Sequence, residues 1–251
     1  IHDLDFLTLT TTCCQIDLIR LFSGGFSTGH GFLREPNDIR SYAALACIAV
    51  QSNQNDQHGG QSIVNFDYGL APGVKKTYRK NLISNTVKAF KLLAPECDIS
   101  KDSVKLALEH IKQNTGTEPS IQANEKFSAA AMAWLIETTH SESTAQKIFE
   151  FVAREAYAET DSATYQAMEA LIHNLNTMHS RAGAQTPFSS INYGMDTSPE
   201  GRMVVRNMLL ATERGLGQGE TPIFPIQICR VKSGVNYSDG EPNYDLFQLA
   251  C

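Results

Sequence analysis

The segment "PFSSINYGMDTSPEGRMVVRNMLLATERGLGQGETPIFPIQIC", 187–229, decides the fold class because it carries three secondary-structure signals in one run. It begins with a strand candidate and ends with another. Between them the sequence predicts a helix that is capped by Thr197 or Ser198, has Pro199 in its first turn and has Glu200 in a capping box. A strand, a helix and a strand in this order form a β-α-β unit, which implies parallel strands, a right-handed crossover and an α/β fold.

The glycines of "GLGQGE" within this segment resemble a dinucleotide-binding loop, but their position argues against that function. Gly215, Gly217 and Gly219 follow the predicted helix and precede the second strand. A loop that binds phosphate must lead from a strand into a helix, so that the N–H groups of the helix N-terminus face the anion. We therefore reject a dinucleotide site here.

The rest of the chain extends the same α/β pattern and has no internal repeat and no obvious linker. A Gly-rich loop is expected at 21–36, and further strand candidates lie at 4–12 and 62–66. Apolar residues at helical spacing predict helices over 37–53, 100–116, 124–140, 143–160 and 161–183. Cys47 lies on the apolar stripe of the first of these helices and is expected to be buried.

Composition excludes several classes of function. The chain has 251 residues, is 42% hydrophobic, carries a net charge of −6 and has no cluster of Lys and Arg. A nucleic-acid partner or an anionic membrane surface is therefore not expected, and no apolar run is long enough to cross a bilayer. The six cysteines are too sparse for a disulfide scaffold, and their spacing is not that of a zinc site. These features predict a cytoplasmic protein with free thiols, a small-molecule substrate and no bound metal in this sequence.

The segment "QSNQNDQHGGQS", 51–62, is unusually rich in amides. Amides form hydrogen bonds without carrying charge, so they suit the lining of a buried, dry cavity. A turn network around Gly59 and Gly60 is the alternative.

The adjacent cysteines Cys13 and Cys14 follow a run of β-branched residues. A disulfide between neighbours would be strained, and a metal would need more ligands than the local sequence offers. In an extended segment consecutive side chains point to opposite faces, so one of the two thiols can face a pocket while the other packs.

Several long motifs in order make the chain similar to the catalytic large subunit of the anaerobic, class III ribonucleotide reductases. They are "HDLDF", "TTTCCQIDL", "GFSTGHGFLREPNDIRSY", the amide-rich segment with its continuation to Val74, "INYGMDTSPEGRMVVRNMLLATERGLGQGETPIFPIQ" and "PNYDLFQLAC". The resemblance runs from Ile1 to Cys251 and is strongest in the first 75 and last 65 residues.

The resemblance implies a ten-stranded α/β barrel of the glycyl-radical enzyme type, built from two antiparallel sets of five parallel strands. This chain would be the first half-barrel with its outer helices, a single partial catalytic domain over 1–251. The family reduces ribonucleoside triphosphates to 2′-deoxyribonucleotides. It uses a glycyl radical made by a radical-SAM iron–sulfur activase, formate as the common reductant, and ATP and deoxynucleoside triphosphates as effectors of a homodimer.

The resemblance also suggests site residues. Cys13 matches the cysteine of a C-x-x-x-D-L pattern on the first barrel strand, which donates hydrogen at the 2′ side of the ribose, and Cys14 is the alternative. His2 matches a histidine near the active site and is a candidate for positioning or protonation. Glu35 is the residue carried over for the deoxynucleotide effector, with a surface helix cap as its other possible role.

Parts of the family pattern are missing from this sequence. It contains no finger-loop Gly-Cys-Arg motif, glycyl-radical segment, C-terminal zinc-binding cysteines or ATP-binding cone, and Cys251 does not replace the finger-loop cysteine. The chain is therefore expected to be a piece of a longer protein and to be inactive alone. The alternatives are another glycyl-radical enzyme similar to formate acetyltransferase, or a truncated paralogue that binds nucleotides without catalysis.

Overall fold

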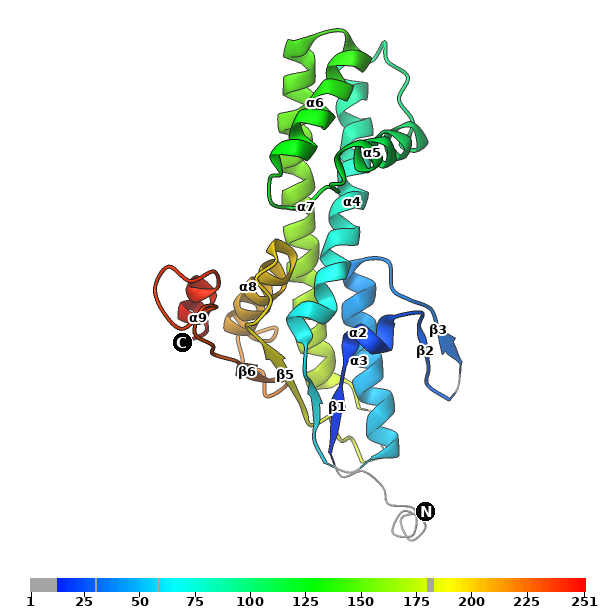
Figure 1. The fold of residues 1–251 in the computed structure, drawn as a ribbon. Coiled ribbons are helices and arrows are strands. Elements are labelled where there is room, and N and C mark those ends of the chain that lie inside the picture. Colours follow the sequence, from blue (N-terminus) through cyan, green and yellow to red (C-terminus); the bar gives the residue numbers. More distant parts are fainter. Residues whose placement is uncertain (1–12, 30, 58, 180–182) are drawn as a thin grey trace. The chain divides into compact units, whose positions relative to one another are not determined.

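The structure is a computed structural model that describes residues 13–251 except 30, 58 and 180–182 (Figure 1). The chain forms two compact units. We call Ile1–Val74 with Ala163–Cys251 the sheet unit, and Lys75–Ser162 the helical unit. Both boundaries lie inside helices, α4 (Phe66–Leu93) and α7 (Glu142–Thr177), so no linker marks them. The description of 1–251 as one domain stays a prediction.

The sheet unit is built on four parallel strands in the order β1-β4-β5-β6 (Figure 1). The register places Gln15, Ser62, Ser190 and Ile226 side by side across the sheet. The predicted α/β class with parallel strands is confirmed, and the ten-stranded barrel stays a prediction. The strands are β1 (Cys14–Ile16), β4 (Gln61–Ile63), β5 (Ser189–Tyr193) and β6 (Ile226–Cys229).

The two faces of the sheet differ because side chains alternate along each strand. The covered face carries Ile16, Ile63 and Ile191, of which none is more than 8% exposed. The other face, which we call the open face, is half-buried or exposed. Its residues are Gln15, Ser62, Ser190, Asn192, Ile226 and Ile228.

The predicted β-α-β unit is confirmed, with α8 (Pro199–Arg214) between β5 and β6. Ser198 is the N-cap, and its hydroxyl accepts a hydrogen bond from the N–H of Gly201. The third helical residue is therefore Gly201, so Glu200 does not occupy the acidic position of a capping box. Glycine is needed there, since a Cβ on Gly201 would lie 2.1 Å from Oδ2 of Asp196.

Four shorter elements and one longer helix complete the sheet unit. The helix predicted over 37–53 is confirmed as α3 (Ile39–Asp56), capped by Asp38, and Cys47 is buried in it. Burial raises the pKa of the Cys47 thiol to about 12. The predicted Gly-rich loop contains a short antiparallel hairpin. The other elements are α2 (Leu18–Phe22), β2 (Phe26–Ser27), β3 (Phe32–Leu33) and α9 (Tyr244–Ala250).

Helix α4 was not predicted, because Gly69, Pro72 and Gly73 are residues that usually interrupt helices. Both glycines instead permit close packing. A Cβ on Gly69 would lie 2.6 Å from Cβ of Leu18, and one on Gly73 would lie 2.9 Å from the ring of Tyr42. Tertiary contacts explain these glycines better than local turns do.

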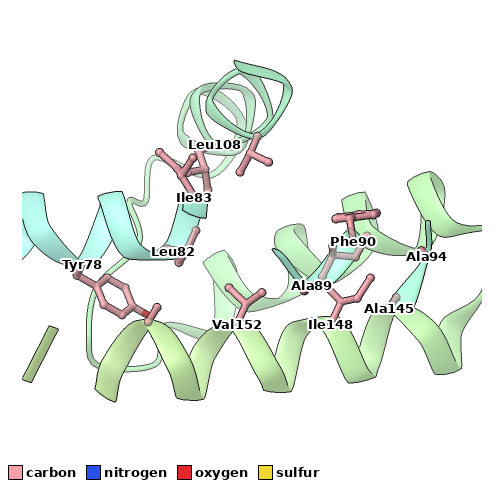
Figure 2. Packing of buried hydrophobic residues seen from close by; sticks show 13 residues of the cluster. Tyr78, Leu82, Ile83, Ala89, Phe90, Ala94, Leu108, Ala145, Ile148 and Val152 are labelled. Atoms are coloured by element: carbon pink, nitrogen blue, oxygen red, sulfur yellow. The ribbon is translucent and has the colours of Figure 1, made fainter. Parts of the chain in front are cut away.

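The helical unit contains α5 (Lys101–Thr115), α6 (Glu125–Thr139) and the parts of α4 and α7 within 75–162. The helices predicted over 143–160 and 161–183 are one continuous helix, α7, which contains neither glycine nor proline. Apolar side chains of these helices form one buried cluster, shown in Figure 2. Among the described residues, no helix is both long enough and apolar enough to span a membrane.

Candidate functional site

The two adjacent cysteines lie at the start of β1. The N–H of Cys14 donates to the carbonyl of Gly60 at 3.1 Å, so the pairing with β4 begins there. Cys14 is half-buried and shares the covered face with Ile16, whereas Cys13, one residue earlier, is exposed. If the alternation of β1 continues to Cys13, its side chain points to the same face as Gln15.

Cys14 lines a cavity of about 640 Å³, which we call the β1 cavity. Residues from β1, α2, the hairpin and α3 line it. The wall combines the charged and polar side chains of Asp17, Arg20 and Asn53 with apolar side chains such as Leu21 and Phe26. Neither Cys13 nor Glu35 is among its lining residues.

Asp17 and Asn65 join the carboxyl ends of β1 and β4. Oδ1 of Asp17 accepts hydrogen bonds from Nδ2 of Asn65 at 2.6 Å and from the N–H of Arg20 at 3.2 Å. Oδ1 of Asn65 accepts in turn from the N–H of Leu18 at 3.0 Å. The bond from Asn65, followed by that from Arg20, lowers the pKa of Asp17. In the C-x-x-x-D-L pattern, Asp17 thus caps α2 and Leu18 is fully buried, so both have structural roles.

Asp67 holds the loop that follows β5, and the sequence analysis did not identify it. The carboxylate is fully buried. Its Oδ2 accepts hydrogen bonds from the N–H groups of three consecutive residues, Gly194, Met195 and Asp196, at 2.9, 2.9 and 3.0 Å. Successive N–H groups that converge on one point form an anion-binding concavity. Here a side chain of the protein itself fills that concavity.

Side chains also bind the three carbonyl groups of the same loop. Nδ2 of Asn243 donates to the carbonyls of Gly194 and Asp196 at 3.2 and 2.9 Å. The hydroxyl of Tyr68 donates to the carbonyl of Met195 at 2.9 Å. The backbone of Gly194–Asp196 is therefore fixed by side chains at each of its N–H and carbonyl groups.

Asp196 is the second buried carboxylate of this loop, at 5% exposure. Burial raises its pKa, although the N–H of Ser198 donates to its Oδ1 at 2.8 Å. Ligands of open parallel sheets bind beyond the carboxyl ends of the strands. The polar groups at this edge, however, bind one another, so they fix the positions of the loops there.

The amide-rich segment connects α3 to the sheet. Its first half is the last part of α3, and its described amides lie at the amino end of β4. Nδ2 of Asn53 donates to Oε1 of Gln61 at 2.9 Å, and Nε2 of Gln61 donates to the carbonyl of Val50 at 2.8 Å. Gln61 is buried on the covered face, so these amides do not line the open face.

The remaining candidate residues are separate from these groups. Glu35 is exposed and lies ahead of α3, whose cap is Asp38, so Glu35 is not the helix cap. His2 lies outside the described residues. No group of three or more His, Cys, Asp or Glu side chains within the described ranges could hold a metal ion.

Comparisons with known proteins give one consistent result. Residues 1–251 match the model of the family described as "Anaerobic ribonucleoside-triphosphate reductase". A relative of that name from Enterobacteria phage T4 is 27% identical over 253 residues, which cover 100% of this chain and 32% of the relative. Relatives of the same name from Haemophilus influenzae and Escherichia coli are each 25% identical over 99% of this chain and 27% of their own length. The chain thus spans about a third or less of the curated relatives that it matches.

Proposed function

The chain belongs to the anaerobic ribonucleoside-triphosphate reductase family, and we propose that the longer protein containing it reduces ribonucleoside triphosphates to 2′-deoxyribonucleoside triphosphates. The observation that carries this proposal is the family match over all of residues 1–251. In the proposal, the parallel sheet is part of a ten-stranded barrel, and the open face lines the interior of that barrel.

The open face has the chemistry that a ribose needs. Gln15, Ser62 and Asn192 are uncharged and can both donate and accept hydrogen bonds, as can the hydroxyl groups of a sugar. Nδ2 of Asn192 already donates to Oγ of Ser62 at 2.7 Å, which links β5 to β4. A neutral surface also avoids fixed charge beside a reactive thiol.

Cys13 is our candidate for the thiol that transfers hydrogen to the 2′ side of the ribose. That transfer needs a neutral S–H group in contact with the sugar carbon, and loss of the 2′-hydroxyl as water needs a proton donor. Exposure of Cys13, one residue before β1, supports this role, whereas Cys14 lies on the covered face with Ile16. His2 is the candidate for positioning or protonation.

The parts that start the reaction are outside this sequence. A glycyl radical, made by a radical-SAM iron–sulfur activase, would supply the initiating radical, and formate would supply the reducing equivalents. Glu35 is our candidate for binding a deoxynucleoside triphosphate effector in a homodimer. Glu35 is exposed and lies two residues after the hairpin strand β3.

An anaerobic product assay tests the proposal. A full-length protein that contains this chain is activated with the activase and S-adenosylmethionine, then given formate and a ribonucleoside triphosphate. We expect the corresponding 2′-deoxynucleotide, and none when formate is left out. Activated protein that carries the radical but converts no ribonucleoside triphosphate would contradict the proposal.

A further inference from the structure

The helical unit contains an apolar cavity that the proposed reaction does not use. Its volume is about 480 Å³, and residues of α4, α5, α6, α7 and the segment between α5 and α6 line it. Aromatic rings from three helices contribute to the wall, among them Tyr78, Trp134 and Phe149. Figure 2 shows Leu82, Leu108, Ile148 and Val152 of the adjoining core, which also line this cavity.

Several polar groups at the wall have partners within the protein. The hydroxyl of Thr86 donates to the carbonyl of Leu82 at 2.7 Å, and Oδ1 of Asn124 accepts from the N–H of Phe127 at 3.1 Å. Arg154 is turned toward Glu155, with Nε 3.0 Å from its carboxylate, and its guanidinium lies 5.8 Å from the centre of the Phe151 ring. The surface presented to the cavity is therefore apolar.

The volume and the apolar wall of the cavity indicate that it can hold a small molecule. The cavity opens to solvent and its wall is mostly apolar. Water inside it finds few hydrogen-bond partners, so an apolar molecule can displace that water favourably. A volume of 480 Å³ lies in the usual range of small-molecule sites, about 300–1,000 Å³.

The segment after α5 is tied down where it meets the cavity. Gly116 ends α5 in the left-handed conformation, and Asn124 caps α6. Between them, Glu118 pairs with Nζ of Lys75 at 2.6 Å and with Nζ of Lys112 at 2.5 Å. Residues 120–123 line the cavity, so these ion pairs hold them in place as part of its wall.

We propose that this cavity is a binding site for a small, uncharged, largely apolar molecule that contacts Trp134. Aromatic and aliphatic side chains recognise such a ligand through contact area. A charged molecule would lose its hydration without gaining a partner. The proposal does not depend on the nucleotide chemistry of the sheet unit.

The single tryptophan of the chain allows a direct test, because Trp134 lines the cavity. The probe is bromobenzene, whose bromine quenches an indole on contact, added to the intact chain while tryptophan emission is recorded. We expect quenching that saturates with one site. The charged analogue 4-bromobenzenesulfonate is the matched probe and should quench only weakly and without saturation.

Two substitutions locate the site. Ala131→Leu places a larger side chain in the wall, and the half-saturating concentration of bromobenzene should rise about tenfold. Ala129→Leu, on an exposed position of the same helix outside the wall, is the control and should leave binding unchanged. Ala153→Leu repeats the test from α7 in case Ala131→Leu does not fold.

Three outcomes would overturn the proposal. The first is quenching by bromobenzene that never saturates, and the second is equal quenching by the sulfonate. The third is a half-saturating concentration of bromobenzene that is the same in Ala131→Leu and Ala153→Leu as in the control Ala129→Leu. Saturable quenching by the neutral probe that the wall substitutions weaken supports it.

Discussion

The sheet unit and the helical unit bury different kinds of side chain. The sheet unit buries the carboxyl groups of Asp67, Asp196 and Glu200. In the helical unit the buried polar side chains among the described residues are all neutral: Thr77, Asn85, Thr86 and Thr160. A buried carboxylate is costly unless it is hydrogen-bonded, so the sheet unit uses such groups to fix the path of its loops. The helical unit depends instead on apolar packing.

The largest effect is expected from the apolar core of the helical unit. Phe90 is 1% exposed, and its ring centroid lies 6.0 Å from that of Trp134. Phe90→Ala should lower the free energy of unfolding by about 4 kcal/mol, because it removes a buried ring and leaves a cavity. Urea denaturation followed by Trp134 emission measures this. Leu92→Ala on the same helix, at a position 71% exposed, is the control, and an equal effect of the two substitutions would contradict the packing argument.

The next effect tests the carboxylate that fixes the loop after β5. Asp67→Asn removes a charged acceptor from three N–H groups and should cost about 3 kcal/mol. Amide hydrogen exchange of Gly194–Asp196 should also speed up. The exposed Asp239→Asn changes the charge equally and should change neither quantity. Unchanged exchange in Asp67→Asn would mean that the loop keeps its path without the carboxylate.

A smaller effect is expected from the close approach of α8 to Asp196. Gly201→Ala places a Cβ 2.1 Å from Oδ2 of Asp196 and should cost about 2 kcal/mol, although alanine favours helices over glycine. A Cβ on Gly217 meets no atom within 4 Å, so Gly217→Ala should be close to neutral. Thermal denaturation of the two variants measures the difference. A stabilised Gly201→Ala variant would refute the contact.

The smallest effect on stability is expected from the surface ion pairs of Glu118 in the helical unit. Hydrogen bonds from Lys112 and then Lys75 lower the pKa of Glu118 from 4.5 to about 2. Because the pKa is lower in the folded protein, the stabilisation is present above pH 4.5 and is lost as the pH falls toward 2. Glu118→Gln should remove this pH dependence and cost no more than about 1 kcal/mol near neutrality. Equal loss of stability of wild type and variant between these pH values would argue against the ion pairs.

Sequence reasoning succeeded where the signals were local. The β-α-β unit of 187–229 was predicted because caps and strand signals lie next to one another. Ser198, one of the two predicted caps, is confirmed, and only the capping box with Glu200 was wrong. Gly69 and Gly73 argued against a helix, so α4 was not predicted. These glycines permit close contact with Leu18 and Tyr42, which come from elsewhere in the chain.

The candidate site shows the same limit. The sequence drew attention to Cys13 and Cys14 and to the alternation that separates them. It could not identify Asp67, because the three N–H groups that bind this carboxylate lie 127 to 129 residues further along the chain. The shared feature of such missed residues is a polar side chain within an apolar context, here between Phe66 and Leu70, which are fully buried.

The most direct test of the central claim compares Cys13→Ser with Cys14→Ser in a full-length reductase that contains this chain. Deoxynucleotide formation and the electron paramagnetic resonance signal of the glycyl radical are measured for both. The account predicts that Cys13→Ser keeps the radical but forms no deoxynucleotide, while Cys14→Ser still forms it. Turnover by Cys13→Ser at the wild-type rate would contradict the account.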